Sequence, residues 1–448
     1  MKKLLLASLL VMISHLSLAA PIDDLVNKYL PNAHVGLLVQ DANSAQVIYG
    51  KNSQQGFAPA SVTKSFSAAA TMVALDPDFS YETKIGYNQD DLVIIFSGDP
   101  SFTSDDLSQL LKNVKAVNGD IIIDNTYFSK PDEARGWVAE DLNWYFGTPA
   151  KTVIIDENQI PIKITPSKTL GQNAELKVMS QDLNIPLTHN VKTVSEFDAK
   201  HLCQLNLELD PENNGVHMYG CWPIAQEATL KVSLANPELR VKQIILATLK
   251  QQNIAFKGKV KIAKANMTQI LATHYSAPLS VLNQTVMQKS HNLYADSLIK
   301  VLGKQQYNRG TMQAGSYAML NILKDKLGVN SQSIRLSDGS GGSVYNQVTP
   351  QDVALLLQKV YTSSYKDTYL NMQKVDETHT VYQRLPKGFN QPLYVKTGSM
   401  TGVSNMAGYI KTRSGKTLIF VSLLNSLPQD KINTRNFETA LIEYLASL

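Results

Sequence analysis

Two apolar-rich stretches near the start of the chain, residues 34–40 and 45–49, flank a polar turn of sequence D-A-N-S. Alternating apolar runs around such a turn are typical of strand, turn and strand. From Ser61 onward, apolar residues recur at three- and four-residue spacing until Asp76-Pro77. This second pattern predicts a helix that stops before that proline.

The pattern changes between about residues 79 and 265, where short β-rich segments alternate with turn clusters. The predicted strands span residues 92–96, 120–124, 152–155 and 160–164. We therefore expect mostly β material here, with a further subdomain between about residues 158 and 228.

Helical periodicity returns over residues 279–302 and 312–327. The tail then predicts strands at 393–395, 406–412 and 417–424, followed by an amphipathic helix over 435–448. We expect that helix to pack against the fold, while dimerisation and peripheral membrane contact stay open.

The N-terminus predicts export. It begins M-K-K, continues with an apolar run over residues 4–18, and has small residues before Ala20, so residues 1–19 fit a cleavable secretory signal. The run is shorter than the roughly 20 residues that span a bilayer, so an uncleaved anchor is the less favoured alternative. At 448 residues the chain is long enough for more than one domain.

Charge and cysteine content exclude some functions. Loss of Lys2 and Lys3 with the signal lowers the net charge from +4 to +2, with acids and bases mixed along the chain, which does not indicate a nucleic-acid partner. Cys203 and Cys221 make an even count in an exported chain, so we expect a structural disulfide, with two buried thiols as the alternative. This pair cannot build a metal cluster, and nothing in the sequence calls for a cofactor.

The stretch P-A-S-V-T-K contains Ser61 three residues before Lys64. Ser-x-x-Lys alone is weak evidence, because the chain also has Ser297/Lys300 and Ser363/Lys366. At the predicted start of a helix, however, the two side chains share a face near free N–H groups. A buried lysine there can lose its proton and act as base for the hydroxyl; the alternative is an ordinary helix cap.

Two further motifs follow in order, Ser290-His291-Asn292 and Lys396-Thr397-Gly398, and each occurs once in the chain. Ser290 could relay a proton to a leaving amine, and Asn292 could orient Lys64 and the substrate. Taken singly, these would be polar helix residues and a strand end. Together with Ser61 and Lys64 they form the motif set of penicillin-binding proteins and serine β-lactamases.

Competing motifs are weaker. The chain lacks G-x-S-x-G, which disfavours an α/β-hydrolase triad. The sequence S-G-K-T at residues 414–417 resembles the end of a phosphate-binding loop, but the glycine required at position 410 is Ile, so we interpret it as a hairpin turn.

Nearly the whole mature chain resembles the class C low-molecular-weight penicillin-binding proteins of the penicillin-binding protein 4 type, peptidase family S13. Beyond the three motifs, the resemblance includes F-S-G-D-P-S-F (96–102), G-W…D-L-N-W-Y-F-G-T-P-A-K (136–151), S-H-N-L-Y-A-D (290–296) and D-G-S-G-x-S (338–343). In this family the gap between the first two motifs, here the 225 residues 65–289, holds inserted domains.

The resemblance implies a multidomain α/β fold. A β-lactamase/transpeptidase-like domain, with an antiparallel sheet covered by helices, would comprise residues 20–78 and 266–448. Mostly β insertions would interrupt it: domain II at 79–157 and 229–265, and domain III at 158–228.

The resemblance also implies a periplasmic serine DD-peptidase that acts on peptidoglycan stem peptides and is acylated by β-lactams. Ser61 would be the nucleophile and Lys64 its base, with Ser290 and Asn292 as the second catalytic element. The remaining implied site residues are those that would bind the terminal carboxylate (Lys396, Thr397, Gly398), form the oxyanion hole (the N–H groups of Ser61 and Ser399) and present an acid towards the site (Asp156).

Two departures from the family pattern leave the peptide preference open. Gly342 and Val344 replace the usual Leu and Arg of D-G-S-G-L-S-R, and Met400-Thr401 stands where Gln is frequent.

Two other functions stay open as well. A serine β-lactamase is disfavoured because no Glu occurs between Ala295 and Val375 to activate a deacylating water. A decayed wall-binding protein is disfavoured by the intact motifs.

Overall fold

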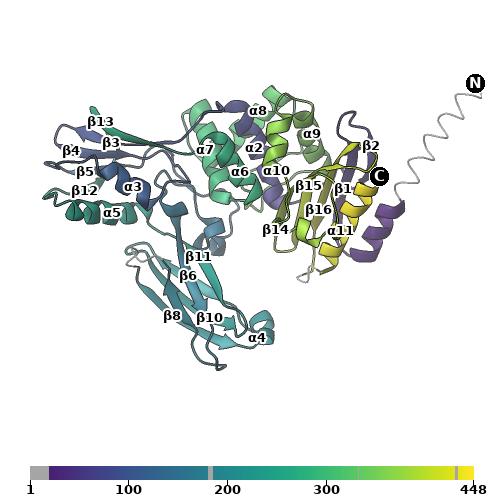
Figure 1. Ribbon diagram of the computed structural model, residues 1–448, viewed down its shortest axis with the longest axis horizontal. Helices are drawn as coiled ribbons and strands as arrows, with labels where there is room; N and C mark the ends of the chain where they lie inside the picture. The colour runs from purple at the N-terminus through teal and green to yellow at the C-terminus, as the bar shows by residue number, and fades with distance from the viewer. Residues whose placement is uncertain (1–19, 180–184, 331, 429–431) are drawn as a thin grey trace, which may run out of the picture. The chain divides into compact units, whose positions relative to one another are not determined.

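The structure is a computed structural model that describes residues 20–179, 185–330, 332–428 and 432–448. The expected signal, residues 1–19, lies outside the described residues. Over the described ranges the chain folds into two compact units, whose elements are labelled in Figure 1. The first unit contains the residues up to 79, residues 134–136 and residues 278–448, and the second contains residues 80–133 and 137–277.

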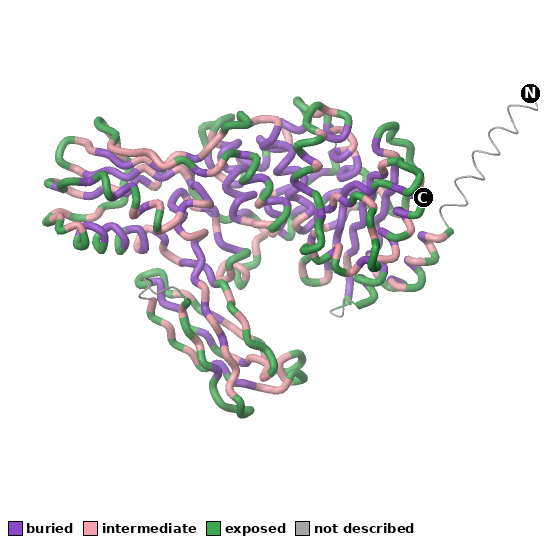
Figure 2. The backbone as a smooth tube through the Cα atoms, viewed as in Figure 1, coloured by how far each residue is buried: buried purple, intermediate pink, exposed green. Residues whose placement is uncertain are grey.

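An antiparallel sheet with strand order β14-β15-β16-β1-β2 organises the first unit. Its strands are β1 (His34–Asp41), β2 (Val47–Lys51), β14 (Leu393–Met400), β15 (Val403–Lys411) and β16 (Thr417–Asn425). Consecutive residues 35–40 of β1 are all buried, as are most of β15 and β16 (Figure 2). Elements cover both faces of these strands, which explains why most of their residues are apolar.

Helices pack on both faces of this sheet. The helices of the unit include α2 (Thr63–Ala74), α6 (Leu279–Gln288), α7 (Asn292–Tyr307), α8 (Met312–Leu327), α9 (Pro350–Tyr361), α10 (Lys366–Gln373) and α11 (Ile432–Ser447). Helix α9 packs on β1 and β16, and α2 packs against α6, α7 and α8. Within the described residues, no helix combines the length and hydrophobicity needed to cross a membrane.

Helix α11 buries its apolar residues in the core on the other face of the sheet. Phe437, Leu441 and Ile442 share a cluster with Ile410 of β15 and Phe420 of β16. The amphipathic tail therefore packs against the fold, which is the outcome that we expected for it.

The second unit contains three sheets in the described residues. The sheet β12-β5-β4-β3-β13 is mixed, because β4 and β12 run parallel to β5, and the sheet β11-β6-β7 is antiparallel. Their strands are β3 (Glu82–Asn88), β4 (Asp91–Ile95), β5 (Ile121–Asp124), β6 (Gln159–Thr165), β7 (Glu175–Val178), β11 (Ala228–Ser233), β12 (Val260–Ile262) and β13 (Gln269–Tyr275).

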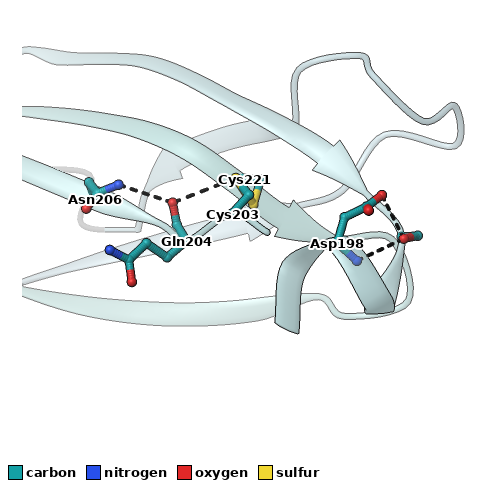
Figure 3. The surroundings of a disulfide bond; sticks show 6 residues. Asp198, Cys203, Gln204, Asn206 and Cys221 are labelled. Carbon is teal, nitrogen blue, oxygen red and sulfur yellow. Dashed lines mark hydrogen bonds between the residues drawn. A yellow bond between two sulfur atoms is a disulfide. The ribbon is translucent and has the colours of Figure 1, made fainter. Parts of the chain in front are cut away.

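The remaining sheet, β8-β10-β9, contains a disulfide at its end. Its strands are β8 (Leu187–Val194), β9 (Asn206–Asp210) and β10 (Gly215–Pro223). The bond joins Cys203, just after α4 (Glu196–His201), to Cys221 in β10 (Figure 3). It closes a loop with a sequence separation of 18, and on the chain-entropy model such a loop contributes about 3 kcal/mol to stability.

The sequence-based expectations for the first unit are largely confirmed. The hairpin forms β1 and β2, the helix after Pro59 ends at Ala74, and residues 312–327 form α8. One helix was expected over residues 279–302, but two are present, because the chain breaks between Gln288 and Asn292.

Two expectations for the second unit were wrong. Residues 152–155 do not form a strand; they are irregular chain whose Val153 and Ile155 enter the core. The unit also contains helices α3 (Ser104–Leu111) and α5 (Pro237–Gln251) that we did not expect. Helix α5 buries Val241 and Ile245 in the core, so its apolar residues follow a helical spacing. We missed this spacing because most of the neighbouring segments have the pattern of strands.

Candidate active site

Ser61 lies in the first unit, half-buried in the short 3₁₀ turn Ala60–Val62 that leads into α2. Ala60 has φ 47°, in the left-handed region, and a Cβ added at Gly341 would overlap its carbonyl. The turn therefore needs a glycine at 341, because only a residue without a side chain leaves room for it.

Two asparagines of the sheet hold the chain just before Ser61. The amide of Asn405, in β15, donates to the carbonyls of Ala58 and Pro59, at 2.8 Å each, and its Oδ1 accepts from Leu424 N at 2.9 Å. Asn425 Oδ1 accepts from Ala58 N at 2.9 Å. These side chains fix the start of α2 to the sheet, and sequence reasoning missed both. The available signal was a polar amide inside or beside a strongly apolar strand.

Lys64 lies one turn after Ser61 and is fully buried. Its ammonium donates to Ser61 Oγ at 2.8 Å, to Asn292 Oδ1 at 2.6 Å and to the Ser340 carbonyl at 2.6 Å. An ammonium has three N–H donors, so these three acceptors use all of them. The fold thus brings the first two motifs of the sequence into direct contact.

Two buried acids, Asp296 and Asp338, organise the segment that supplies the Ser340 carbonyl. Asp296 Oδ1 accepts from Gly339 N and Ser340 N at 2.9 Å each, and Asp338 Oδ1 accepts from Gly341 N at 2.8 Å. Sequence reasoning assigned neither acid a role. Both stand inside stretches of small or apolar residues, where a charged residue needs partners.

The titration of this cluster is shifted by burial. Desolvation lowers the pKa of Lys64 from 10.5 to about 8, although the nearby Asp296 and Asp338 favour its charged form. Desolvation raises the pKa of Asp296, and the carboxylate of Asp338 adds to that shift. Lys64 can therefore be neutral close to physiological pH, and a neutral amine is what a general base requires.

The buried Lys396 and the half-buried Ser290 form a second pair. Lys396 Nζ donates to Ser290 Oγ at 2.8 Å and to the Thr397 carbonyl at 2.8 Å. Burial, followed by the charge of Lys64, holds the pKa of Lys396 well below its ordinary value. Ser290 was expected just inside a helix, but it lies between α6 and α7 with φ 53°. That break allows Ser290 to meet Lys396 while Asn292, at the start of α7, meets Lys64.

Gly398 brings β14 against the turn that contains Ser61. A Cβ added at Gly398 would lie 2.8 Å from Pro59 O and 2.9 Å from the backbone nitrogens of Ser61 and Val62. Real Cβ atoms do not approach other atoms so closely, so this position accepts only glycine without rearrangement. On the same strand, Thr397 is half-buried and Ser399 is exposed.

Asp156 belongs to the second unit. It accepts hydrogen bonds from the backbone N and the hydroxyl of Ser104, at the start of α3. The three residues Asp156, Glu157 and Asn158 all have φ between 50° and 57°. Such conformations are costly for residues other than glycine and often mark functional segments. A role for Asp156 towards substrate stays a prediction.

The other Ser-x-x-Lys copies have different surroundings. Ser297 and Lys300 are fully buried in α7. Ser363 Oγ donates to Val360 O at 2.8 Å, and the Lys366 ammonium lies 3.9 Å from the centre of the Tyr361 ring. Within the described ranges, no group of three or more His, Cys, Asp or Glu side chains is arranged to hold a metal ion.

Known proteins resemble this chain over most of its length. D-alanyl-D-alanine carboxypeptidase DacB of Haemophilus influenzae is 28% identical over 449 residues, covering 95% of this chain and 92% of that protein. The crystal structure of penicillin binding protein 4 (dacB) from Haemophilus influenzae, 27% identical, matches with a TM-score of 0.85 over 95% of this chain and 99% of that chain.

A second crystal structure of the Haemophilus influenzae protein, complexed with a β-lactam, matches with a TM-score of 0.80 at the same identity and coverage. The family model of D-Ala-D-Ala carboxypeptidase 3 (S13) matches residues 18–448, which is nearly the whole sequence. The chain therefore belongs to the D-Ala-D-Ala carboxypeptidase 3 (S13) family.

Proposed function

We propose that the mature chain is a periplasmic serine DD-peptidase that cleaves peptide bonds after D-Ala in peptidoglycan stem peptides. The observation that carries the proposal is the buried ammonium of Lys64, which is bonded at once to Ser61 Oγ and Asn292 Oδ1. Such contacts place a base of lowered pKa on a hydroxyl that would otherwise be a weak nucleophile. The carboxypeptidase name of the Haemophilus influenzae relative supports the same activity.

The reaction begins with neutral Lys64. It accepts the Ser61 hydroxyl proton while Oγ bonds to the D-Ala carbonyl carbon. The backbone N–H groups of Ser61 and Ser399 stabilise the resulting oxyanion, and preorganised donors of this kind contribute much of the catalysis in acyl transfer. As the C–N bond breaks, the proton that Lys64 accepted passes through Ser290 to the leaving amine, which leaves Lys64 neutral again. Water then hydrolyses the ester, releasing the peptide acid and restoring the Ser61 hydroxyl.

Substrate would be held along β14. Its terminal carboxylate would meet Lys396 and Thr397, with Gly398 leaving room for the chain beside Ser61. Lys396 is buried with a depressed pKa, so an incoming carboxylate supplies the opposite charge that favours its ammonium form.

The exposed Val344 bears on which stem peptides the protein prefers. Val344 is 54% exposed where the family usually has Arg, so we propose weak recognition of a charged stem-peptide end.

The cleavable signal expected over residues 1–19 would export the protein to the periplasm, where peptidoglycan is accessible.

Intact mass of the mature protein mixed with benzylpenicillin, followed over time, tests the proposal. We expect a persistent adduct that is lost in Ser61→Ala and retained in the matched control Ser363→Ala, which changes the serine of another Ser-x-x-Lys copy. Rapid release of the adduct would instead indicate a β-lactamase. Absence of any adduct would indicate a wall-binding protein without catalysis.

A further inference from the structure

A cavity of about 420 Å³ lies in the first unit beside the outer edge of β14. Its lining includes Thr397 of β14, residues 287–289 and the segment 372–380. That segment follows the strand edge, because Lys374 pairs with Tyr394 in an antiparallel bridge. The volume falls within the roughly 300–1,000 Å³ of typical ligand pockets.

The cavity lies next to the part of the active site that would hold the leaving group. This step rests on the proposed function, in which Thr397 binds the carboxylate of the residue whose amine is released and Ser290 protonates that amine. Thr397 is in the lining, and Lys289, also in the lining, directly precedes Ser290. A group attached to the released amine's residue would therefore extend into this cavity.

The lining offers two cations and a neutral donor. Lys289 and Lys374 are exposed, and the acid Asp376 already accepts from the backbone N and hydroxyl of Thr378 at 2.9 and 2.6 Å. Burial and the charge of Lys396 lower the pKa of His379, which favours the neutral ring.

The His379 ring has a defined orientation. Val381 N donates to its Nδ1 at 3.2 Å, so in the neutral ring the proton is on Nε2 and available as a donor. Cationic side chains together with a neutral N–H donor suit the carboxylates and carbonyls of an acidic peptide.

We propose that this cavity binds the leaving peptide of a cross-linked pair of stem peptides. This acidic peptide is the one whose amine is released when the amide bond at the D-Ala carbonyl is cut. A single D-Ala leaving group would occupy only its mouth, at Thr397. Lys289, Lys374 and His379 thus determine specificity for cross-links and favour endopeptidase over carboxypeptidase turnover.

The test compares kcat/KM for two substrates with the same acyl side: a stem pentapeptide ending in D-Ala-D-Ala, and a cross-linked stem-peptide dimer. Reversing two exposed charges in Lys289→Glu/Lys374→Glu should lower the ratio of dimer to pentapeptide kcat/KM by about ten-fold. His379→Gln should lower the same ratio less. The charge-matched control Lys324→Glu/Lys326→Glu, on α8, should leave it unchanged.

Acylation of the wild-type protein by benzylpenicillin separates the two proposals. Without acylation the proposed function itself fails. With acylation intact, an unchanged ratio in the Lys289/Lys374 variant overturns the leaving-group subsite, and so does an equal loss on both substrates. Failure of the wild-type protein to cut the dimer at all would overturn it as well. Thermal unfolding of each variant confirms that the fold is retained.

Discussion

The Nζ atom of Lys64 lies 2.6 Å from Oδ1 of Asn292, a residue 228 positions later in the chain. The acceptor is a neutral amide, so it orients the lysine without adding charge. A carboxylate at that position would stabilise the ammonium, and the lysine would then be a poorer base.

Asn292→Asp should therefore raise the pKa of Lys64 and slow acylation by benzylpenicillin about ten-fold at pH 7. The rate should recover as the pH is raised, because the base becomes neutral again. The measurement is the second-order acylation rate against pH, with the exposed Asn390→Asp as control. A variant profile that coincides with wild type would contradict the assignment.

The wild-type acylation rate should rise about ten-fold for each pH unit below the pKa of Lys64 and level off above it. Burial lowers that pKa to about 8, so the neutral fraction grows through the range from about pH 6 to 8. Stopped-flow acylation with a chromogenic β-lactam measures this profile. A rate that falls as the pH rises would show that the charged lysine is the active form.

Gly398→Ala should lower the acylation rate about 100-fold, because the new Cβ would displace the backbone N–H of Ser61, which we propose as an oxyanion donor. Gly50→Ala is a suitable control, since its nearest neighbour would be 3.7 Å away. Both variants should melt at similar temperatures if the effect is confined to the site. Acylation of Gly398→Ala at the wild-type rate would argue against the close approach.

Asn405→Ala should reduce the free energy of unfolding by about 3 kcal/mol, because the carbonyls of Ala58 and Pro59 and the N–H of Leu424 lose a buried partner. Acylation should slow as well, since these bonds position the turn before Ser61. Urea unfolding and acylation kinetics check the two effects. The exposed Asn43→Ala should be near neutral in both, and equal behaviour of the two variants would refute the anchoring role.

Val344→Arg should raise kcat/KM for stem peptides that carry a free carboxylate at the end of the stem, by about three- to ten-fold. The reason is that Val344 is exposed and apolar, so it offers such a carboxylate no charge partner. Hydrolysis of peptides with and without that carboxylate measures the effect. Val47→Arg, at an exposed position of β2, provides the control. Equal rates for the two peptides in Val344→Arg would remove the basis for the proposed weak recognition.

Several properties follow from the sequence by itself. The local spacing of apolar residues predicted α8 and the β1–β2 hairpin, because a helix with one buried face and a pair of buried strands each repeat apolar residues at a regular interval. The order of the three motifs predicted which serine and which lysine pair in the site. Periodicity failed at residues 279–302, where both halves are helical and only the left-handed Ser290 marks the break.

The tertiary structure decided what surrounds those residues. Asp296, Asp338 and the Ser340 carbonyl reach Lys64 from α7 and the segment after α8, and only folding brings them together. The pKa of Lys64 depends on its burial, which no local pattern records. The sequence by itself therefore determined that Ser61 and Lys64 lie close together at the start of a helix. Only folding buries Lys64, lowers its pKa and adds hydrogen-bond partners that are distant in sequence, and these distinguish a nucleophile from a helix cap.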